Sequence, residues 1–249
     1  MTYEEVYGNE KINYCFRFDY NSSWFDYPNS LSIPRICSHT PGGRMISNNK
    51  NQKIKEVPQD ELEVIERYII LLLGARDSPI PSLLHLEKEM FIFSKINEKV
   101  RKFIPFTPHY QGPYSDLLKD AIESPLYFPS AWEIIDKGGK KEIVLTSKGK
   151  KIFEELVKMF GKDENFSSSL RNLKLIRELY DRLSEEELLI LVYFTYPEYI
   201  TKSKILESII RKGEEIAQSL LRKGIITEEK YEEIIKWVKS YRREKYSNS

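Results

Sequence analysis

Three residues near the N-terminus, Cys15, Cys37 and His39, carry the side chains best suited to binding a metal ion. Thiolates and imidazoles are preferred zinc ligands, but these residues lack the C-x-x-C spacing of a zinc knuckle and supply only three ligands. The two cysteines could instead form a disulfide, and this choice stays open. We predict that the chain binds no metal and no cofactor.

The other two histidines, His85 and His109, do not complete a catalytic set. His85 falls inside an apolar helical pattern, which favours a hydrogen-bonded core residue, and His109 lies in a loop that it can order by hydrogen bonding. The sequence has no phosphate-binding, dinucleotide-binding, esterase or zinc-protease motif. The run Glu185-Glu186-Glu187 suits the first turn of a helix, where carboxylates favour the macrodipole. We predict that the chain is not an enzyme.

Lysines form the first candidate binding surface. Six of them fall at a predicted hairpin tip and at the start of the following helix: Lys137, Lys140, Lys141, Lys148, Lys150 and Lys151. Such cations can neutralise phosphates of double-stranded DNA and position a protein on it without reading bases. The alternative is a solvated turn in a lysine-rich protein.

A second basic segment runs from residue 35 to residue 55 and contains no acidic residue. Its cations are Arg35, Arg44, Lys50, Lys53 and Lys55. Pro41-Gly42-Gly43 and Asn48-Asn49 interrupt any regular structure, so we expect a mobile basic loop. Such a loop can form a flexible DNA contact, although loops of this composition are also commonly idle.

The third predicted helix conflicts with DNA binding. In a helix-turn-helix protein, the helix after the turn enters the major groove, which makes Tyr114, Ser115 and Lys119 candidate DNA contacts. The same helix carries Asp116, Asp120 and Glu123, and carboxylates face phosphates unfavourably. In the alternative, Tyr114 packs inward and the segment merely starts a helix.

The elements that would position these residues follow from apolar periodicity and breakers. Asp60 with Glu63 forms a capping-box pattern for a helix that ends at Gly74, and Pro81 fits the first turn of a second helix. We expect the third helix to begin at Gly112-Pro113.

Next come two strand-like runs, 132–135 and 142–145, on either side of the turn signal Gly138-Gly139, and then a helix capped by Thr146. The order of three helices, a hairpin and a helix predicts a winged helix-turn-helix at residues 58–160, with a small β-hairpin wing.

Residues 161–249 predict a C-terminal helical domain. Ser184 with Glu187 forms another capping box, and Tyr196-Pro197 ends that helix. A further helix is expected over 205–220, and a last one from Thr227 carries an apolar stripe. These stripes suggest dimerisation, while packing within the monomer competes for them. Residues 1–57 form an aromatic-rich N-terminal extension.

Composition limits the class of protein. Lys and Arg total 39 and Asp and Glu total 38, which excludes a bulk polycation, and no apolar run approaches the about 20 residues of a membrane span. We predict a mainly α, cytoplasmic protein with no membrane partner. With 26 Lys and 29 Glu against 4 Ala, the chain has a bias typical of hyperthermophile proteins, which favours a heat-loving archaeal source.

The segment from Phe106 to Leu118 contains the pattern GPYS-x-x-L, and Leu145 to Lys150 reads LTSKGK. In these motifs the sequence resembles a prokaryotic winged-helix regulator family, mostly uncharacterised, and its layout is similar to the Panacea domain of SocA-like antitoxins. The resemblance covers roughly residues 60–200. It implies a winged-helix fold and is poorly specific for function.

Together these observations predict a DNA-binding protein, a transcriptional regulator that works as a homodimer on double-stranded DNA. The alternative is a protein-interaction module, antitoxin-like or adaptor, that grips a protein partner through the acidic third helix and the aromatic N-terminal segment.

Overall fold

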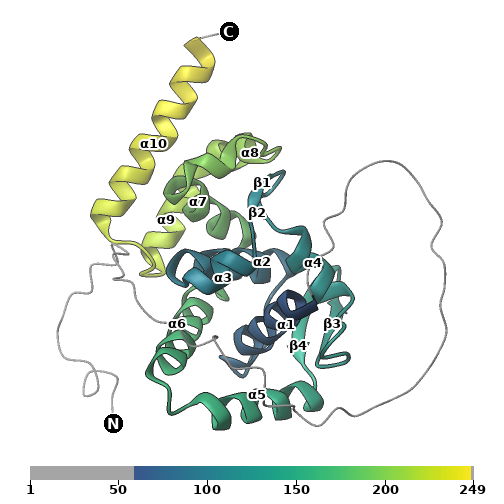
Figure 1. Cartoon of the computed structure of the whole chain (residues 1–249). Helices are drawn as coiled ribbons and strands as arrows, with labels where there is room; N and C mark the ends of the chain where they lie inside the picture. Colours follow the sequence, from purple (N-terminus) through teal and green to yellow (C-terminus); the bar gives the residue numbers. More distant parts are fainter. Residues whose placement is uncertain (1–58, 248–249) are drawn as a thin grey trace, which may run out of the picture. The chain divides into compact units, whose positions relative to one another are not determined.

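The structure is a computed structural model that describes residues 59–247. Helices make up most of this part, and two small antiparallel hairpins interrupt them (Figure 1). The elements are α1 (Gln59–Gly74), α2 (Leu83–Ile96), α3 (Glu98–Phe103), β1 (Thr107–His109), β2 (Gly112–Tyr114), α4 (Asp116–Glu123), β3 (Trp132–Lys137), β4 (Lys140–Leu145), α5 (Ser147–Phe160), α6 (Glu164–Tyr180), α7 (Glu185–Thr195), η2 (Pro197–Ile200), α8 (Leu206–Arg211), α9 (Gly213–Arg222) and α10 (Glu228–Ser247). The predicted mainly α class is confirmed for these residues. The N-terminal extension, residues 1–57, lies outside them.

None of the helices in the described part combines the length and the apolar run that a bilayer span requires. Helix α1 ends at Gly74, as predicted, but begins at Gln59, so Asp60 lies within its first turn and is not its cap. Helix α2 begins two residues after Pro81, with Ser82 as its N-cap.

Helix α2 is enclosed on nearly every side. From Leu84 to Ser94, only Glu87 keeps partial exposure, and the helix packs against α6, α7 and β2 (Figure 1). A helix in this position must satisfy each polar group that it buries. For His85, Nδ1 lies 2.9 Å from Ser82 Oγ and Nε2 lies 3.0 Å from the Leu183 carbonyl oxygen. The prediction of a hydrogen-bonded core histidine is confirmed.

Arg177 of α6 closes the C-terminal end of α1. Its side chain is fully buried, and Nη1 donates to the carbonyl oxygens of Leu72 at 2.9 Å and Leu73 at 3.2 Å. The last carbonyls of a helix lack partners within the helix, so this cation supplies them from another segment. Helix α6 therefore packs on α1 and α2 across the predicted boundary at residues 160–161, which itself stays a prediction.

Glu89 of α2 lies beside the same cation, with Oε2 at 3.7 Å from Arg177 Nε. Both side chains are fully buried. Burial raises the pKa of Glu89 well above its ordinary value, and the neighbouring Asp181 raises it further, while Arg177 opposes both effects. The fold therefore favours the protonated form of this carboxyl group.

The predicted hairpin is confirmed as β3 and β4. Gly138 and Gly139 form its two-residue turn with φ of +66° and +89°, and such turns need the left-handed conformation at both positions. Ile80, in the α1–α2 connection, exchanges two backbone hydrogen bonds with Ile143 of β4, at 2.9 and 3.0 Å. Strand β4 consequently lies between β3 and the Ile80 segment. Thr146 caps α5 by accepting from the Gly149 N–H, as predicted.

The segment before α4 differs from the prediction. Gly112-Pro113 does not open a helix but forms β2, which pairs with β1, and α4 begins at Asp116 with Ser115 as its N-cap. Helix α3 was also not predicted. Helices α2 and α4 are thus joined by residues 97–115, which contain a helix and a hairpin, and not by the three- or four-residue turn of a simple helix-turn-helix.

In the C-terminal part, the predicted capping box of α7 is present. Glu187 Oε2 accepts from the Ser184 N–H at 2.7 Å and from Lys223 Nζ of α9 at 2.6 Å, and Oε1 accepts from Ser219 at 2.6 Å. Burial raises the pKa of Glu187, but the hydrogen bonds from Lys223, Ser219 and Ser184 outweigh this effect and hold the pKa below its ordinary value. One carboxylate thus joins α7 to α9.

The single helix expected over 205–220 is two helices, α8 and α9, which meet at Lys212. Gly213 begins α9, and a Cβ there would lie 2.7 Å from Val238 Cγ2, so the glycine allows α10 to approach closely. Ile234 and Val238 of the last predicted stripe are fully buried within the chain. Monomer packing therefore occupies these two residues, and dimerisation stays a prediction.

Candidate functional site

The GPYS segment lies between α2 and α4, and its residues have distinct structural roles. Gly112 has φ of +85°, and a Cβ there would lie 3.0 Å from Tyr193 Cε1 of α7. The carbonyl of Pro113 accepts from Lys88 Nζ at 2.6 Å, and the Ser115 hydroxyl accepts from the Leu118 N–H. The motif is therefore explained by packing and capping.

An ion pair within α2 lies next to the GPYS segment. Lys88 Nζ lies 2.6 Å from Glu87 Oε2, and the Lys88 side chain is fully buried. Burial lowers the pKa of Lys88, and Glu87 opposes this shift. Burial raises the pKa of Glu87, while Lys88 and a hydrogen bond from the Ser115 backbone oppose it. A charge buried without a partner is costly, and Glu87 supplies that partner for Lys88. Because Lys88 also donates to the Pro113 carbonyl, the pair joins α2 to the GPYS backbone.

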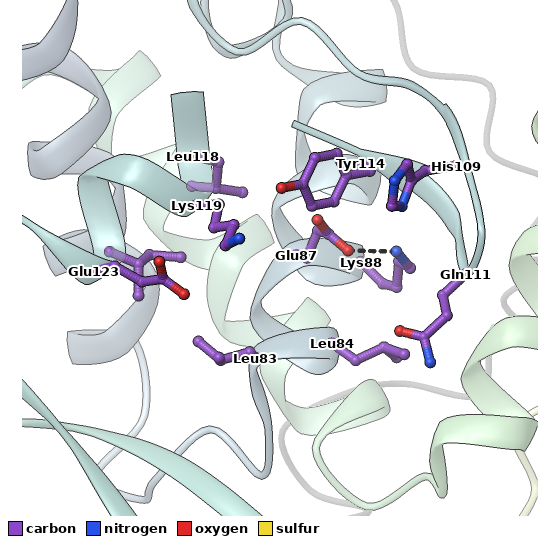
Figure 2. Close-up of a pocket in the computed structure, with 11 residues that line it drawn as sticks. Leu83, Leu84, Glu87, Lys88, His109, Gln111, Tyr114, Leu118, Lys119 and Glu123 are labelled. Carbon is purple, nitrogen blue, oxygen red and sulfur yellow. Dashed lines mark hydrogen bonds and ion pairs between the residues drawn. The ribbon is translucent and has the colours of Figure 1, made fainter. Parts of the chain in front are cut away.

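A cleft of about 290 Å³ opens beside this ion pair (Figure 2). It is lined by α2, by β1, β2 and the turn between them, and by α4: Leu83, Leu84, Glu87, Lys88, His109, Gln111, Tyr114, Leu118, Lys119, Ile122 and Glu123. Leucine and isoleucine side chains form its apolar part. In Figure 2, Lys119 and Glu123 from α4 lie on one side, and Tyr114 and His109 lie on the other.

His109 and Tyr114 stack on each other across the β1–β2 hairpin, with ring centroids 4.5 Å apart. His109 was predicted to order this segment by hydrogen bonding, and ring stacking is the contact that the structure gives it. Burial raises the pKa of Tyr114 to about 12, and the neighbouring Asp116 adds to the shift. The tyrosine hydroxyl therefore remains protonated at neutral pH, as a hydrogen-bond donor.

The outer face of α4 is acidic. Asp116, Asp120 and Glu123 are exposed and follow an i, i+4, i+7 spacing, which places them along one side of the helix. We call these three residues the acidic stripe. Lys119 is exposed beside them. The stripe is thus an anionic surface that borders the cleft, because Glu123 belongs to both.

The structure gives the three predicted DNA contacts of this region different positions. Ser115 is 2% exposed and caps α4. Tyr114 is half-buried in its stack with His109, and Lys119 is exposed at the cleft. Only Lys119 presents a cation to solvent.

The six predicted lysines are not equivalent. Lys137 lies 2.6 Å from Glu142, and Lys150 lies 3.0 Å from Asp77, so carboxylates neutralise both. Lys148 Nζ donates to the Pro129 carbonyl at 2.7 Å. The other three are exposed and, within residues 59–247, form no ion pair: Lys140, Lys141 and Lys151.

The remaining predicted site residues, Arg35, Arg44, Lys50, Lys53 and Lys55, lie outside the described residues, as do Cys15, Cys37 and His39. Among the residues that the structure describes, no cluster of three or more histidine, cysteine or acidic side chains is arranged to hold a metal ion.

Neither the cleft nor the Glu87–Lys88 ion pair beside it was predicted from the sequence. The available signal was the run Glu87-Lys88-Glu89 inside an otherwise apolar helix, because charged residues are rarely buried without partners. No protein-family model and no curated protein matches the chain. Function must therefore be inferred from geometry and charge.

Proposed function

We propose that this chain is a protein-interaction module whose α4 face binds a cationic segment of a partner protein. The acidic stripe carries this proposal, because three exposed carboxylates lie along one helix face with a single lysine beside them. Opposite charges across an interface steer encounter and fix register. A lysine- or arginine-rich segment complements this face.

The order of the elements around α4 is consistent with a winged-helix topology. Helices α1, α2 and α4 precede the β3–β4 hairpin, and the Ile80–Ile143 bridge adds a third short segment to it. In a helix-turn-helix protein the helix after the turn makes the main contacts with its ligand, and α4 has this position in the order of elements. The same framework therefore suits a protein ligand when that helix is acidic.

Two observations favour a protein partner over DNA. The helix that would enter the major groove has three exposed acids, which phosphates repel. Residues 97–115 also replace the short turn that normally sets the angle between the two helices of the motif.

Transcriptional regulation through DNA remains the second candidate, and Lys140 and Lys141 favour it. Both lie at or beside the tip of the hairpin, both are exposed, and neither is ion-paired among the described residues. In this reading the hairpin follows the DNA backbone and supplies charge without sequence readout.

Fluorescence anisotropy with two labelled probes, a decalysine peptide and a short duplex DNA, tests the choice over a salt series. The test variant is Asp120→Asn/Glu123→Gln, and the matched control is Glu154→Gln/Glu155→Gln, which removes two exposed carboxylates from α5. We expect decalysine to bind with salt-dependent affinity and the test variant to weaken it roughly two- to thirtyfold, given ~0.2–1 kcal/mol for each of the two exposed charge pairs removed. The control should bind like the wild type.

The opposite pattern would reject the proposal. If duplex DNA binds at low salt, loses affinity in Lys140→Ala/Lys141→Ala and is indifferent to the stripe variant, the second candidate replaces the first. Equal losses in the stripe variant and the α5 control would show that decalysine responds only to net charge, which also contradicts the proposal.

A further inference from the structure

We infer that the cleft between α2, β2 and α4 is an anchor pocket for one large aromatic side chain of the cationic partner segment. This inference rests on the proposed function and extends it, because it defines the partner as a basic segment with a single aromatic anchor. The stripe attracts such a segment, and the cleft selects it.

The size of the cleft fits one side chain. At about 290 Å³, it lies at the lower limit of the roughly 300–1,000 Å³ typical of pockets for whole small molecules. Its apolar part comes from Leu83, Leu84, Leu118 and Ile122. Large aromatic side chains that enter such pockets contribute most of the binding energy in many protein interfaces.

The polar groups of the cleft suit an aromatic side chain that has a polar tip. Glu87 keeps 16% of its side chain exposed, at the cleft, and its carboxylate can accept from an indole N–H or a phenol O–H. The Tyr114 ring, which lies beside Glu87 in Figure 2, also lines the cleft and offers a stacking surface. An aliphatic anchor has no N–H or O–H group, so it would leave this carboxylate without a further hydrogen-bond donor.

The pocket is preformed, which reduces the entropic cost of binding. Lys88 is fixed to the Pro113 carbonyl and to Glu87, and Ser115 caps α4. These contacts hold the walls of the cleft in place.

The position of Glu123 connects the two halves of the site. It is the last residue of α4, it ends the acidic stripe, and it lines the cleft. A peptide that pairs its basic side chains with the stripe therefore passes the mouth of the cleft. The aromatic residue of the peptide must then be close in sequence to its basic residues.

Two labelled peptides test the inference: a lysine-rich peptide with one central tryptophan and the same peptide with alanine there. We expect the tryptophan peptide to bind roughly tenfold more tightly, because burying an aromatic side chain contributes more than an exposed charge pair. The substitution Leu83→Trp, which places an indole at the cleft, should remove this advantage and leave the alanine peptide unchanged. NMR gives a readout that needs no variant. The methyl resonances of Leu84, Leu118 and Ile122 should shift when the tryptophan peptide is added and should not shift with the alanine peptide.

Equal affinity for the two peptides, with both sensitive to Asp120→Asn/Glu123→Gln, would overturn the anchor pocket and leave the proposed function intact. If Asp120→Asn/Glu123→Gln weakens the binding of neither peptide, the proposed function is rejected instead. If free indole shifts the cleft methyls but the tryptophan peptide has no advantage, the cleft is a small-molecule pocket and the inference is wrong.

Discussion

Glu66 allows a sharp test of how α4 is joined to the hairpin. This residue of α1 is 1% exposed, and its carboxylate accepts the backbone N–H groups of Leu126, Tyr127 and Phe128 at 2.7, 3.0 and 2.8 Å. These three groups belong to the connection between α4 and β3. One side chain thus fixes the loop that sets α4 relative to the wing.

In Glu66→Gln, the side chain keeps one acceptor oxygen and places an amide N–H₂ near a donor. One charged hydrogen bond is lost and two become neutral, which at ~1.5–3 kcal/mol for charged and ~0.5–1.5 kcal/mol for neutral bonds gives a loss of roughly 3.5–6 kcal/mol. Leu126 is 69% exposed, so water can reach part of the loop, and we expect about 3 kcal/mol.

Urea and thermal unfolding measure this loss. For a domain of this size, about 3 kcal/mol corresponds to a fall in Tm of roughly 6–12 °C. The control is Glu63→Gln on the same helix, which removes only a half-buried i,i+4 pair with Arg67 and should cost about 0.5 kcal/mol. If Glu66→Gln and Glu63→Gln unfold within about 0.5 kcal/mol of each other, on the order of the value of one helical ion pair, the loop is held by other contacts and the reasoning fails.

Three other results are expected. Gly112→Ala should destabilise the protein more than Gly139→Ala, by about 1 kcal/mol or more, since both have positive φ but only Gly112 faces a packed ring; equal losses in urea unfolding would contradict this. Because the folded pKa of Glu89 is raised, the wild type should lose stability relative to Glu89→Gln as pH rises above about 4.5. Because the folded pKa of Glu187 is lowered, the wild type should lose stability relative to Glu187→Gln as pH falls below about 4.5. Thermal melts between pH ~2.5 and ~8 measure both slopes, and a wild-type curve that runs parallel to the curve of either variant would contradict the corresponding pKa shift. Light scattering tests the homodimer that the second candidate function requires: a dimer would support that function, and a monomer at all concentrations would rule it out.

Local signals in the sequence predicted much of the fold. The Gly138-Gly139 turn and the Ser184–Glu187 capping box rest on interactions between close neighbours in the chain, so their residues suffice to identify them. The Gly112-Pro113 prediction was wrong because a helix start and a strand are both compatible with proline, and in the structure these residues pair with Pro108 and His109 of β1.

The candidate site was only partly predictable. The acids of α4 are visible in the sequence, and their i, i+4, i+7 spacing follows from it. The cleft is not visible, because Glu87 and Glu123 come from helices that only tertiary packing brings together. Likewise, Asp77 neutralises Lys150 across 73 positions of the chain, which no local pattern can reveal.

The enclosure of α2 has a consequence for synthesis on the ribosome. Helices α6 and α7, which cover it, are completed only at Thr195, roughly 100 residues after α2 ends at Ile96. At about 5–20 residues per second, the nascent chain exposes the apolar sides of α2 for some 5–20 s. During this interval it is a substrate for chaperones and prone to aggregate, so a slower translation rate in this stretch lowers the yield of native protein.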